Sequence, residues 1–312
     1  MDAWEESLRD LAGRLARQGG RARPLSARSQ TAYLRDARLL ARWLREHGVA
    51  SPSKVSPSAL EAAFRDMAWS AATRARALTS LREWLGPLFP PGRCPADLVE
   101  RPRHQPPPVP RLSQADAAAL VEGIGAGPAA PARSPRRALA LRDRAIAEVL
   151  YGGGRRRQEV CDLVLAGVDF EHETIRVLGK GGRARTVPLT EPAVDALRLW
   201  LAEGRPALAG SPFEAAGRAR VFLSRTGRPL DGTAVYRVVA RALRSAGRAG
   251  GPHLLRHAAG THLLEGPGGR GGAHLRVVQE ILGHASIATT QRYTAVTTRA
   301  MQRTLRRAHP RG

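Results

Sequence analysis

The chain has 312 residues, enough for about two domains of roughly 150 residues each. It carries 50 Lys and Arg against 27 Asp and Glu, a net charge of +23 that predicts a polyanionic partner, with nucleic acid favoured over an anionic membrane. The first residues lack a basic or apolar signal region, no run of about 18 apolar residues occurs, and two cysteines cannot form a disulfide framework. We therefore expect a cytoplasmic protein that is neither secreted nor membrane-spanning.

Helical periodicity dominates the first third of the chain. From Ser26 to Trp84, apolar residues recur at spacings of three and four with arginines between them, which is typical of basic amphipathic helices. Ser58 and Glu61 have the spacing of a capping box at the start of one helix, and Thr73 to Leu85 predicts another. We predict a small all-α domain over residues 1–103.

A proline-rich run separates this part from the rest. Residues 101–110 read RPRHQPPPVP, and four of the last five are proline, so the run cannot sustain a helix or a central strand. We place an interdomain linker at residues 104–111. A proline-rich ligand for a signalling domain is the alternative interpretation.

The remaining residues, 112–312, predict a mainly helical domain with a small antiparallel sheet. Ser113 and Asp116 belong to a capping box that opens a helix to about Val121, and Ala138 to Leu150 predicts a second helix. Two β-rich runs, 174–178 and 185–189, flank Gly179–Gly182 and predict a hairpin with Lys180 at its turn. Helical patterns then cover 190–203, 231–245, 253–264, 275–282 and 297–307.

Lysine is rare in this arginine-rich chain. It occurs only at Lys54 and Lys180, so arginine supplies 48 of the 50 basic residues. Arginine keeps its proton near neutral pH, whereas lysine can release one when its pKa is shifted. A lysine in this background therefore indicates either proton transfer or chance survival of a codon.

Six residues of the second part could act on a phosphate. They are Arg156, Lys180, His253, Arg256, His284 and Tyr293. His253 and Arg256 are three residues apart, so on a helix they could hold one anion together, although a surface pair is an equal alternative. Taken singly, His284 fits a helix cap and Tyr293 fits a core residue as well as a nucleophile.

A metal site is not favoured. His257 and His262 lie close together, but no HExxH pattern and no Cys or Asp at ligand spacing accompanies them. We expect no metal and no cofactor.

Four blocks of the second part together resemble the tyrosine recombinase (phage-type integrase) family, most of all the bacterial Xer recombinases. They are LYGGGRRRQEVCDL at 150–163, VLGKGGRARTVPL at 177–189, PHLLRHAAGTHLL at 252–264 and LRVVQEILGHASIATTQRYT at 275–294. The block at 25–44 resembles the family's helical, SAM-like core-binding domain. The resemblance implies an all-α core-binding domain followed by an α+β catalytic domain with the DNA breaking–rejoining fold.

By this resemblance, Tyr293 is the nucleophile and Lys180 is the hairpin lysine. Arg156 and Arg256 would bind the non-bridging oxygens of a phosphodiester, whose charge grows in the transition state. His253 or His284 would accept the tyrosine proton or hold a phosphate oxygen, and which does which stays open. Lys180 would protonate the departing 5′ oxygen. The 3′-phosphotyrosyl intermediate keeps the bond energy, so neither ATP nor a metal is required.

Two departures from the family pattern affect how the family's site residues are assigned to positions of this chain. Arg155, Arg156 and Arg157 are consecutive, so the first arginine could be displaced by one residue, although Glu159 three residues later favours Arg156. The glycine-rich residues Gly266–Gly272 lengthen a usually tight loop, which either alters strand or partner contacts or is a solvated surface loop.

The resemblance implies a bacterial, nucleoid-associated recombinase that acts on double-stranded DNA. It implies a homo- or hetero-tetramer on paired sites, the latter with a second recombinase, and Xer-type resolution of chromosome dimers. The alternatives are an integrase of a mobile element, a DNA-binding protein that has lost cleavage, and a type IB topoisomerase-like enzyme. In relatives the last segment, 297–309, docks onto a neighbouring subunit, so its deletion is predicted to weaken assembly more than folding.

Overall fold

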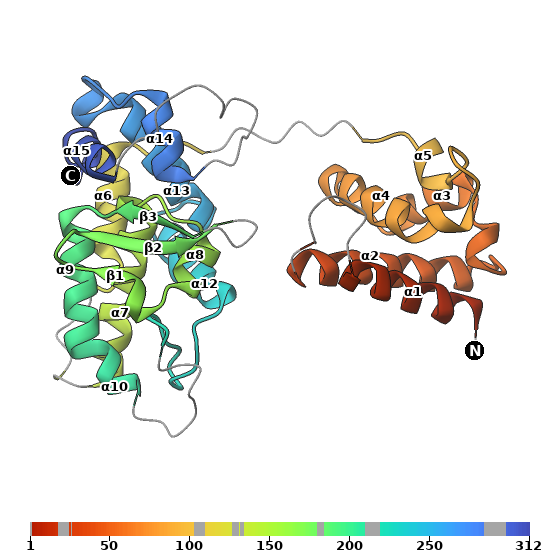
Figure 1. Ribbon diagram of the computed structural model, residues 1–312, viewed down its shortest axis with the longest axis horizontal. Helices are drawn as coiled ribbons and strands as arrows, with labels where there is room; N and C mark the ends of the chain where they lie inside the picture. The colour runs from red at the N-terminus through yellow and green to blue at the C-terminus, as the bar shows by residue number, and fades with distance from the viewer. Residues whose placement is uncertain are drawn as a thin grey trace. The chain divides into compact units, whose positions relative to one another are not determined.

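The computed structural model describes residues 2–17, 25, 27–102, 110–126, 131, 134–179, 184–209, 219–283 and 298–312. The chain divides into two compact units, Met1–Pro108 and Val109–Gly312, which are considered separately (Figure 1). The predicted linker at 104–111 lies almost entirely outside the described residues. Its limits, and the predicted domains 1–103 and 112–312 on either side, stay predictions.

The described residues of the first unit form helices joined by turns and irregular segments, without a strand. Its α-helices are α1 (Ala3–Arg17), α2 (Ala27–Glu46), α3 (Pro57–Asp66), α4 (Ala71–Leu85) and the short α5 (Pro95–Leu98). Their apolar faces meet in one core, which includes Trp4, Leu11, Leu40, Phe64 and Trp84. Helix α1 was not predicted, although Trp4, Leu11 and Leu15 have helical spacing and are all buried.

The predicted start of α3 was wrong by two residues. Ser56, not Ser58, is the N-cap, and its hydroxyl accepts a hydrogen bond from the backbone N–H of Ala59 at 3.1 Å. Pro57 then occupies the first helical position, where a fixed φ and a missing N–H carry no penalty. Ser58 is therefore already inside the helix.

The second unit is built from nine described α-helices around a small sheet. They are α6 (Gln114–Gly123), α7 (Pro135–Gly152), α8 (Arg157–Asp162), α9 (Glu191–Leu199), α10 (Arg205–Ala209), α12 (Gly232–Ser245), α13 (Pro252–Glu265), α14 (Leu275–Leu282) and α15 (Thr298–Ala308). The predicted cap of α6 is confirmed, because the Ser113 hydroxyl accepts from the N–H of Asp116 at 3.0 Å. A π-helical turn, Trp200–Gly204, joins α9 to α10, so this helical region extends beyond the predicted limit at 203.

The sheet has three antiparallel strands in the order β1 (Val168–Asp169), β2 (Thr174–Leu178) and β3 (Ala184–Pro188). The predicted hairpin is confirmed as β2 and β3, with Ile175 opposite Val187, both buried in the main core. β1 was not predicted, since two residues carry no periodic pattern. Lys180, at the predicted turn, lies outside the described residues. The expected mainly helical architecture with a small antiparallel sheet is confirmed (Figure 1).

Helix α15 packs onto its own chain. Met301, Leu305 and Ala308 are buried against Leu263 of α13 and Ile281 and Leu282 of α14. Arg306 pairs with Glu173 in the turn between β1 and β2, and beyond the helix Arg311 donates to the buried Glu148 of α7 at 2.8 Å. The apolar residues of α15 are thus part of a core within one chain, and the ion pairs of Arg306 and Arg311 hold the segment on either side of that core.

We therefore expect deletion after Val296 to destabilise the monomer itself. Burial of Met301 and Leu305 contributes about 1.5–3 kcal/mol for each side chain, so the loss should be at least about 3 kcal/mol. Urea unfolding of the full-length and truncated chains, without DNA, measures this difference. Equal midpoints, with weaker assembly on DNA alone, would restore the earlier prediction that the segment serves assembly.

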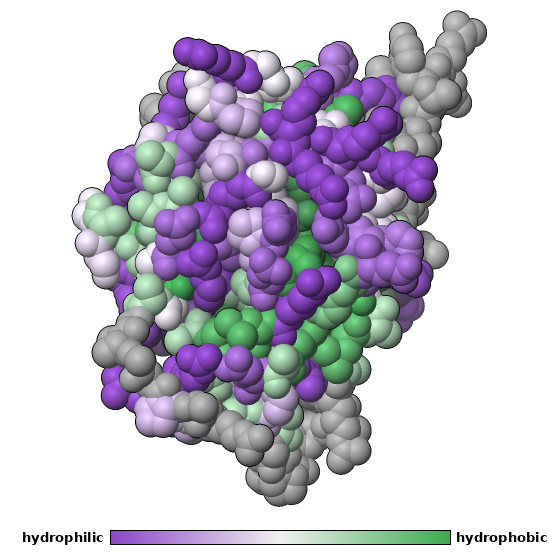
Figure 2. Space-filling view, turned by 90° about the vertical axis from the view of Figure 1, so that its left-hand side faces the viewer, coloured by the Kyte–Doolittle hydropathy of each residue, from purple (hydrophilic) through white to green (hydrophobic). Residues whose placement is uncertain are grey.

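Among the described residues no helix is long and apolar enough to cross a membrane. The face shown in Figure 2 is mostly hydrophilic, with an apolar area between the polar side chains.

Candidate active site

A glycine turn after α7 places two arginines beside α14. Gly154 has a φ of +62°, and a Cβ at this residue would lie 2.6 Å from a methyl carbon of Leu282. Only glycine combines this left-handed conformation with such a close approach. Arg155 and Arg156 follow directly, and Arg156 is the N-cap of α8.

Arg256, on the second turn of α13, binds this turn to the end of α14. Its side chain is buried, and its Nη1 donates to the carbonyl of Gly154 at 2.7 Å while Nη2 donates to the carbonyl of Leu282 at 2.8 Å. Burial, and then the nearby charge of Arg156, lower the pKa of Arg256 to about 10. The guanidinium remains charged at neutral pH and is fixed in position.

Arg156, at the start of α8, also contacts the C-terminal end of α14. Its Nη2 donates to the carbonyl of Gly283 at 2.7 Å, and its Nη1 donates to Oε1 of Glu159 at 3.0 Å. The last carbonyls of a helix have no partner within the helix and carry partial negative charge, so they attract both arginines. The side chain of Arg156 is 39% exposed, which leaves part of its guanidinium free to meet a ligand.

Two further arginines of this cluster were not predicted as site residues. Arg185 on β3 donates from Nη2 to Oε1 of Glu159 at 2.9 Å. Arg155 is completely buried, donates to the carbonyls of Gly153 and Ile281, and has its pKa lowered to about 9 by burial. Arg185 shares a strand face with the buried Val187, which was a signal that this arginine needs a carboxylate partner.

We define the arginine cluster as Arg155, Arg156, Arg185 and Arg256, and among the described residues Glu159 is its single carboxylate. Burial opposes ionisation of Glu159, but the charge of Arg155 and hydrogen bonds from Arg156 and Arg185 outweigh it and lower its pKa. Four guanidinium groups around one carboxylate leave a strong local excess of positive charge. The cluster is suited to an anion with several oxygen atoms, such as a phosphodiester.

The two neighbouring arginines have different environments. Both polar contacts of Arg155 are to backbone carbonyls inside the protein, whereas Arg156 lies at the edge of the cluster and is partly exposed. Because of this difference, Arg156 can contact a ligand, whereas Arg155 holds the backbone of Gly153 and Ile281. The one-residue displacement considered from the sequence is therefore not favoured.

Of the six predicted site residues, the structure brings Arg156 and Arg256 together. His253 is exposed on the first turn of α13, three residues before Arg256. Lys180, His284 and Tyr293 lie outside the described residues. His284 directly follows Gly283, whose carbonyl Arg156 binds, and Tyr293 belongs to the segment that joins α14 to α15.

No group of three metal-binding side chains occurs within the described ranges. His262 is buried, with Nε2 at 2.9 Å from the carbonyl of Leu112 and Nδ1 at 2.9 Å from the hydroxyl of Tyr151. A neutral imidazole that donates from Nε2 and accepts at Nδ1 satisfies both contacts. His262 therefore has a structural partner on each nitrogen.

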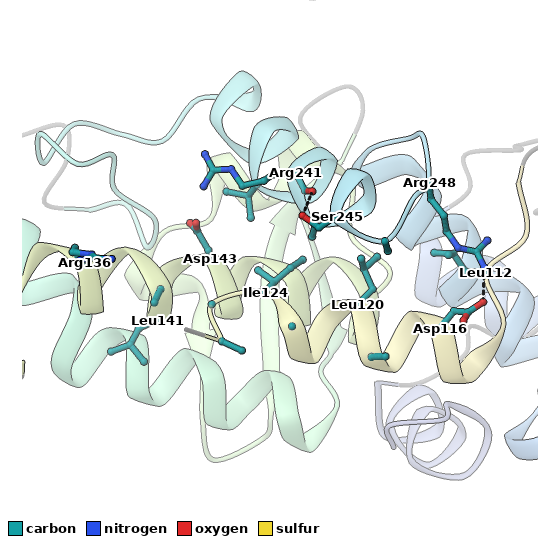
Figure 3. A pocket seen from close by; sticks show the side chains of 18 of the residues that line it. Leu112, Asp116, Leu120, Ile124, Arg136, Leu141, Asp143, Arg241, Ser245 and Arg248 are labelled. Carbon is teal, nitrogen blue, oxygen red and sulfur yellow. Dashed lines mark hydrogen bonds and ion pairs between the residues drawn. The ribbon is translucent and has the colours of Figure 1, made fainter. Parts of the chain in front are cut away.

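A cavity of the second unit is separate from the arginine cluster. It has a volume of about 790 Å³ between α6, α7 and α12, with an apolar floor that includes Leu120, Ile124 and Leu141 (Figure 3). Arg248 and Asp116 form an ion pair of 2.7 Å at one end. Neither His253 nor any of the clustered arginines lines this cavity.

The glycine-rich loop after α13 is largely exposed and is held at its start. The side-chain amide of Gln114 donates to the carbonyl of Gly266 at 2.7 Å and accepts from the N–H of Gly268 at 3.0 Å. Gly268, Gly269 and Gly271 are all left-handed and exposed. The loop is thus a surface loop tied to the beginning of α6.

Comparison with known proteins gives one consistent result. The model of the phage integrase family matches residues 129–299. The tyrosine recombinase XerC of Mycobacterium tuberculosis is 40% identical over 309 residues, which cover 95% of this chain and 96% of that protein. XerC of Mycobacterium sp. (strain KMS) is 49% identical over 175 residues, 55% of each chain.

Two solved structures share the fold. The XerH recombinase bound to its difH substrate has a TM-score of 0.65 at 18% identity, with 91% of this chain and 92% of that one covered. The Tn1549 transposon integrase in complex with transposon right end DNA also has a TM-score of 0.65 at 18% identity, with coverage of 96% and 97%. These likenesses confirm the fold predicted for the catalytic part.

Proposed function

Because the chain belongs to the phage integrase family and is a tyrosine-type site-specific DNA recombinase, we propose that it cleaves and rejoins DNA with Arg156, Lys180, His253, Arg256, His284 and Tyr293. The observation that carries this assignment is the convergence of Arg156 and Arg256 on the carbonyls of Leu282 and Gly283. The chain continues from there into His284 and the segment with Tyr293. The arginines supply positive charge at the end of α14, the last described residues before His284 and Tyr293 in the sequence.

In the proposed reaction, the phenolate oxygen of Tyr293 attacks phosphorus, and the bond from phosphorus to the 5′ oxygen breaks. Arg156 and Arg256 offset the charge that grows on the non-bridging oxygens. Since Glu159 and backbone carbonyls already hold these arginines, little reorganisation is needed as the charge develops. His253 or His284 takes the tyrosine proton, and Lys180 gives a proton to the leaving oxygen.

The proposed partner is duplex DNA, bound by both units as a homo- or hetero-tetramer on paired sites. The net charge of +23 supports this, and solved relatives include a lambda integrase dimer bound to a core site and a lambda integrase tetramer bound to a Holliday junction. Action on DNA would place the protein at the nucleoid. Identity of 40% to XerC over most of the chain favours Xer-type resolution of chromosome dimers over integration of a mobile element.

The test is to trap the covalent protein–DNA complex and sequence the attached DNA ends. We expect genomic fragments to share one short site, and a plasmid with two copies of that site to undergo strand exchange. Relaxation of supercoiled DNA without strand exchange would instead indicate a topoisomerase-like enzyme. Binding without any covalent complex would indicate a DNA-binding protein that has lost cleavage.

A further inference from the structure

A buried carboxylate lies between α2 and α4 of the first unit. Asp36 is on α2 and is only 1% exposed, although it is charged and both helices are rich in arginine. Helices α2 and α4 pack side by side (Figure 1). A buried carboxylate is costly unless it is paired, so its partners show what it stabilises.

Its partners are two arginines that remain at the surface. Arg76 on α4 donates from Nε and Nη2 to the two carboxylate oxygens of Asp36, at 2.8 and 3.2 Å. Arg35 donates from Nη2 to Oδ1 at 3.3 Å. The side chains of Arg76 and Arg35 are 40% and 61% exposed.

The arrangement leaves donors directed away from the carboxylate. Each guanidinium has five N–H groups in a fixed plane, and Arg76 uses only its Nε and Nη2 on Asp36. Within the described residues, neither guanidinium has another acceptor. Asp36 therefore fixes the plane of Arg76 and the head of Arg35 while most of their N–H groups stay free for an external anion.

We propose that Asp36 is a positioning residue that holds Arg35 and Arg76 as a two-arginine phosphate grip on the DNA backbone. The planar fork of arginine matches a phosphate, and Arg38 extends the exposed positive charge along α2. This proposal rests on the proposed function, because the phosphate is that of duplex DNA. A purely structural brace between α2 and α4 is the alternative that the test must separate.

Asp36→Asn distinguishes the phosphate grip from a structural brace, because it removes a negative charge. If charge alone governed binding, this variant would bind DNA more tightly, since its net charge rises by one. We expect it to bind generic duplex about tenfold more weakly than the parent at low salt, the loss typical of one charged hydrogen bond. Glu61→Gln on α3 is the control: it makes the same charge change at an exposed residue and should bind as tightly as the parent or slightly more.

Arg76→Lys keeps the net charge and tests the grip if Asp36→Asn does not fold. We expect it to weaken binding severalfold, because lysine cannot make the planar fork. The double variant Arg35→Gln, Arg76→Gln should reduce the steepness of log affinity against log salt by about 0.9, the contribution of one phosphate. Adding Asp36→Asn to this double variant should have no further effect.

The outcomes distinguish this proposal from the function on which it rests. If the parent chain does not bind duplex DNA, the proposed function fails. If the parent binds but Asp36→Asn, folded at the assay temperature, binds equally or more tightly, the grip is wrong and Asp36 is a structural brace. The same conclusion follows if Arg76→Lys binds as the parent does, or if Asp36→Asn weakens binding further when Arg35 and Arg76 are both replaced.

Discussion

Tyr293→Phe should abolish covalent attachment of the protein to DNA and leave DNA binding nearly unchanged. The hydroxyl oxygen is the proposed nucleophile, and the phenylalanine ring keeps most of the apolar contacts of tyrosine. The measurement is a gel under denaturing conditions with a labelled DNA substrate that traps the cleaved complex, together with a binding titration. A denaturation-resistant adduct formed by the phenylalanine variant would overturn the assignment of the nucleophile.

Two other tyrosines provide matched controls. Tyr236 on α12 is exposed. Tyr151 on α7 is buried, and its hydroxyl is hydrogen-bonded to Nδ1 of His262. Burial raises the pKa of Tyr151, which opposes formation of a phenolate. Both tyrosine-to-phenylalanine variants should still form the adduct, and Tyr151→Phe should lose about 1 kcal/mol of stability with its hydrogen bond.

The second large effect is expected at Lys180. If this lysine protonates the leaving 5′ oxygen, Lys180→Ala and Lys180→Arg should both slow cleavage by about 10²–10⁴-fold. The arginine variant keeps the positive charge but cannot release its proton near neutral pH. Single-turnover cleavage of a short duplex measures the chemical step directly.

A substrate with sulfur at the 5′ bridging position gives the diagnostic test. A thiolate leaves with little help from an acid, so both Lys180 variants should recover much of their rate. Arg156→Ala should stay slow on this substrate, because its contact to the non-bridging oxygens is still missing. Equal rescue of Arg156→Ala, or no rescue of the Lys180 variants, would mean that Lys180 is not the general acid.

The sequence alone was sufficient for the parts of this protein that have a local pattern. Helical spacing located most helices, the cap at Ser113 was read correctly, and alternating β-rich residues predicted the β2–β3 hairpin. The spacing of His253 and Arg256 placed both on one helix, as the structure has them. The ordered motifs also indicated the family, which the comparisons confirm.

Only the tertiary structure decided which charged groups meet. Arg185 and Glu159 are 26 residues apart, and Arg76 and Asp36 are 40 apart, so no local period joins them. The same limit applies to α15, because the residues of α13 and α14 that bury its apolar side chains are distant in the sequence. A chain with 48 arginines offers many equivalent cations. Packing selects among them, because a buried carboxylate must be paired and only the folded chain brings a particular guanidinium within reach.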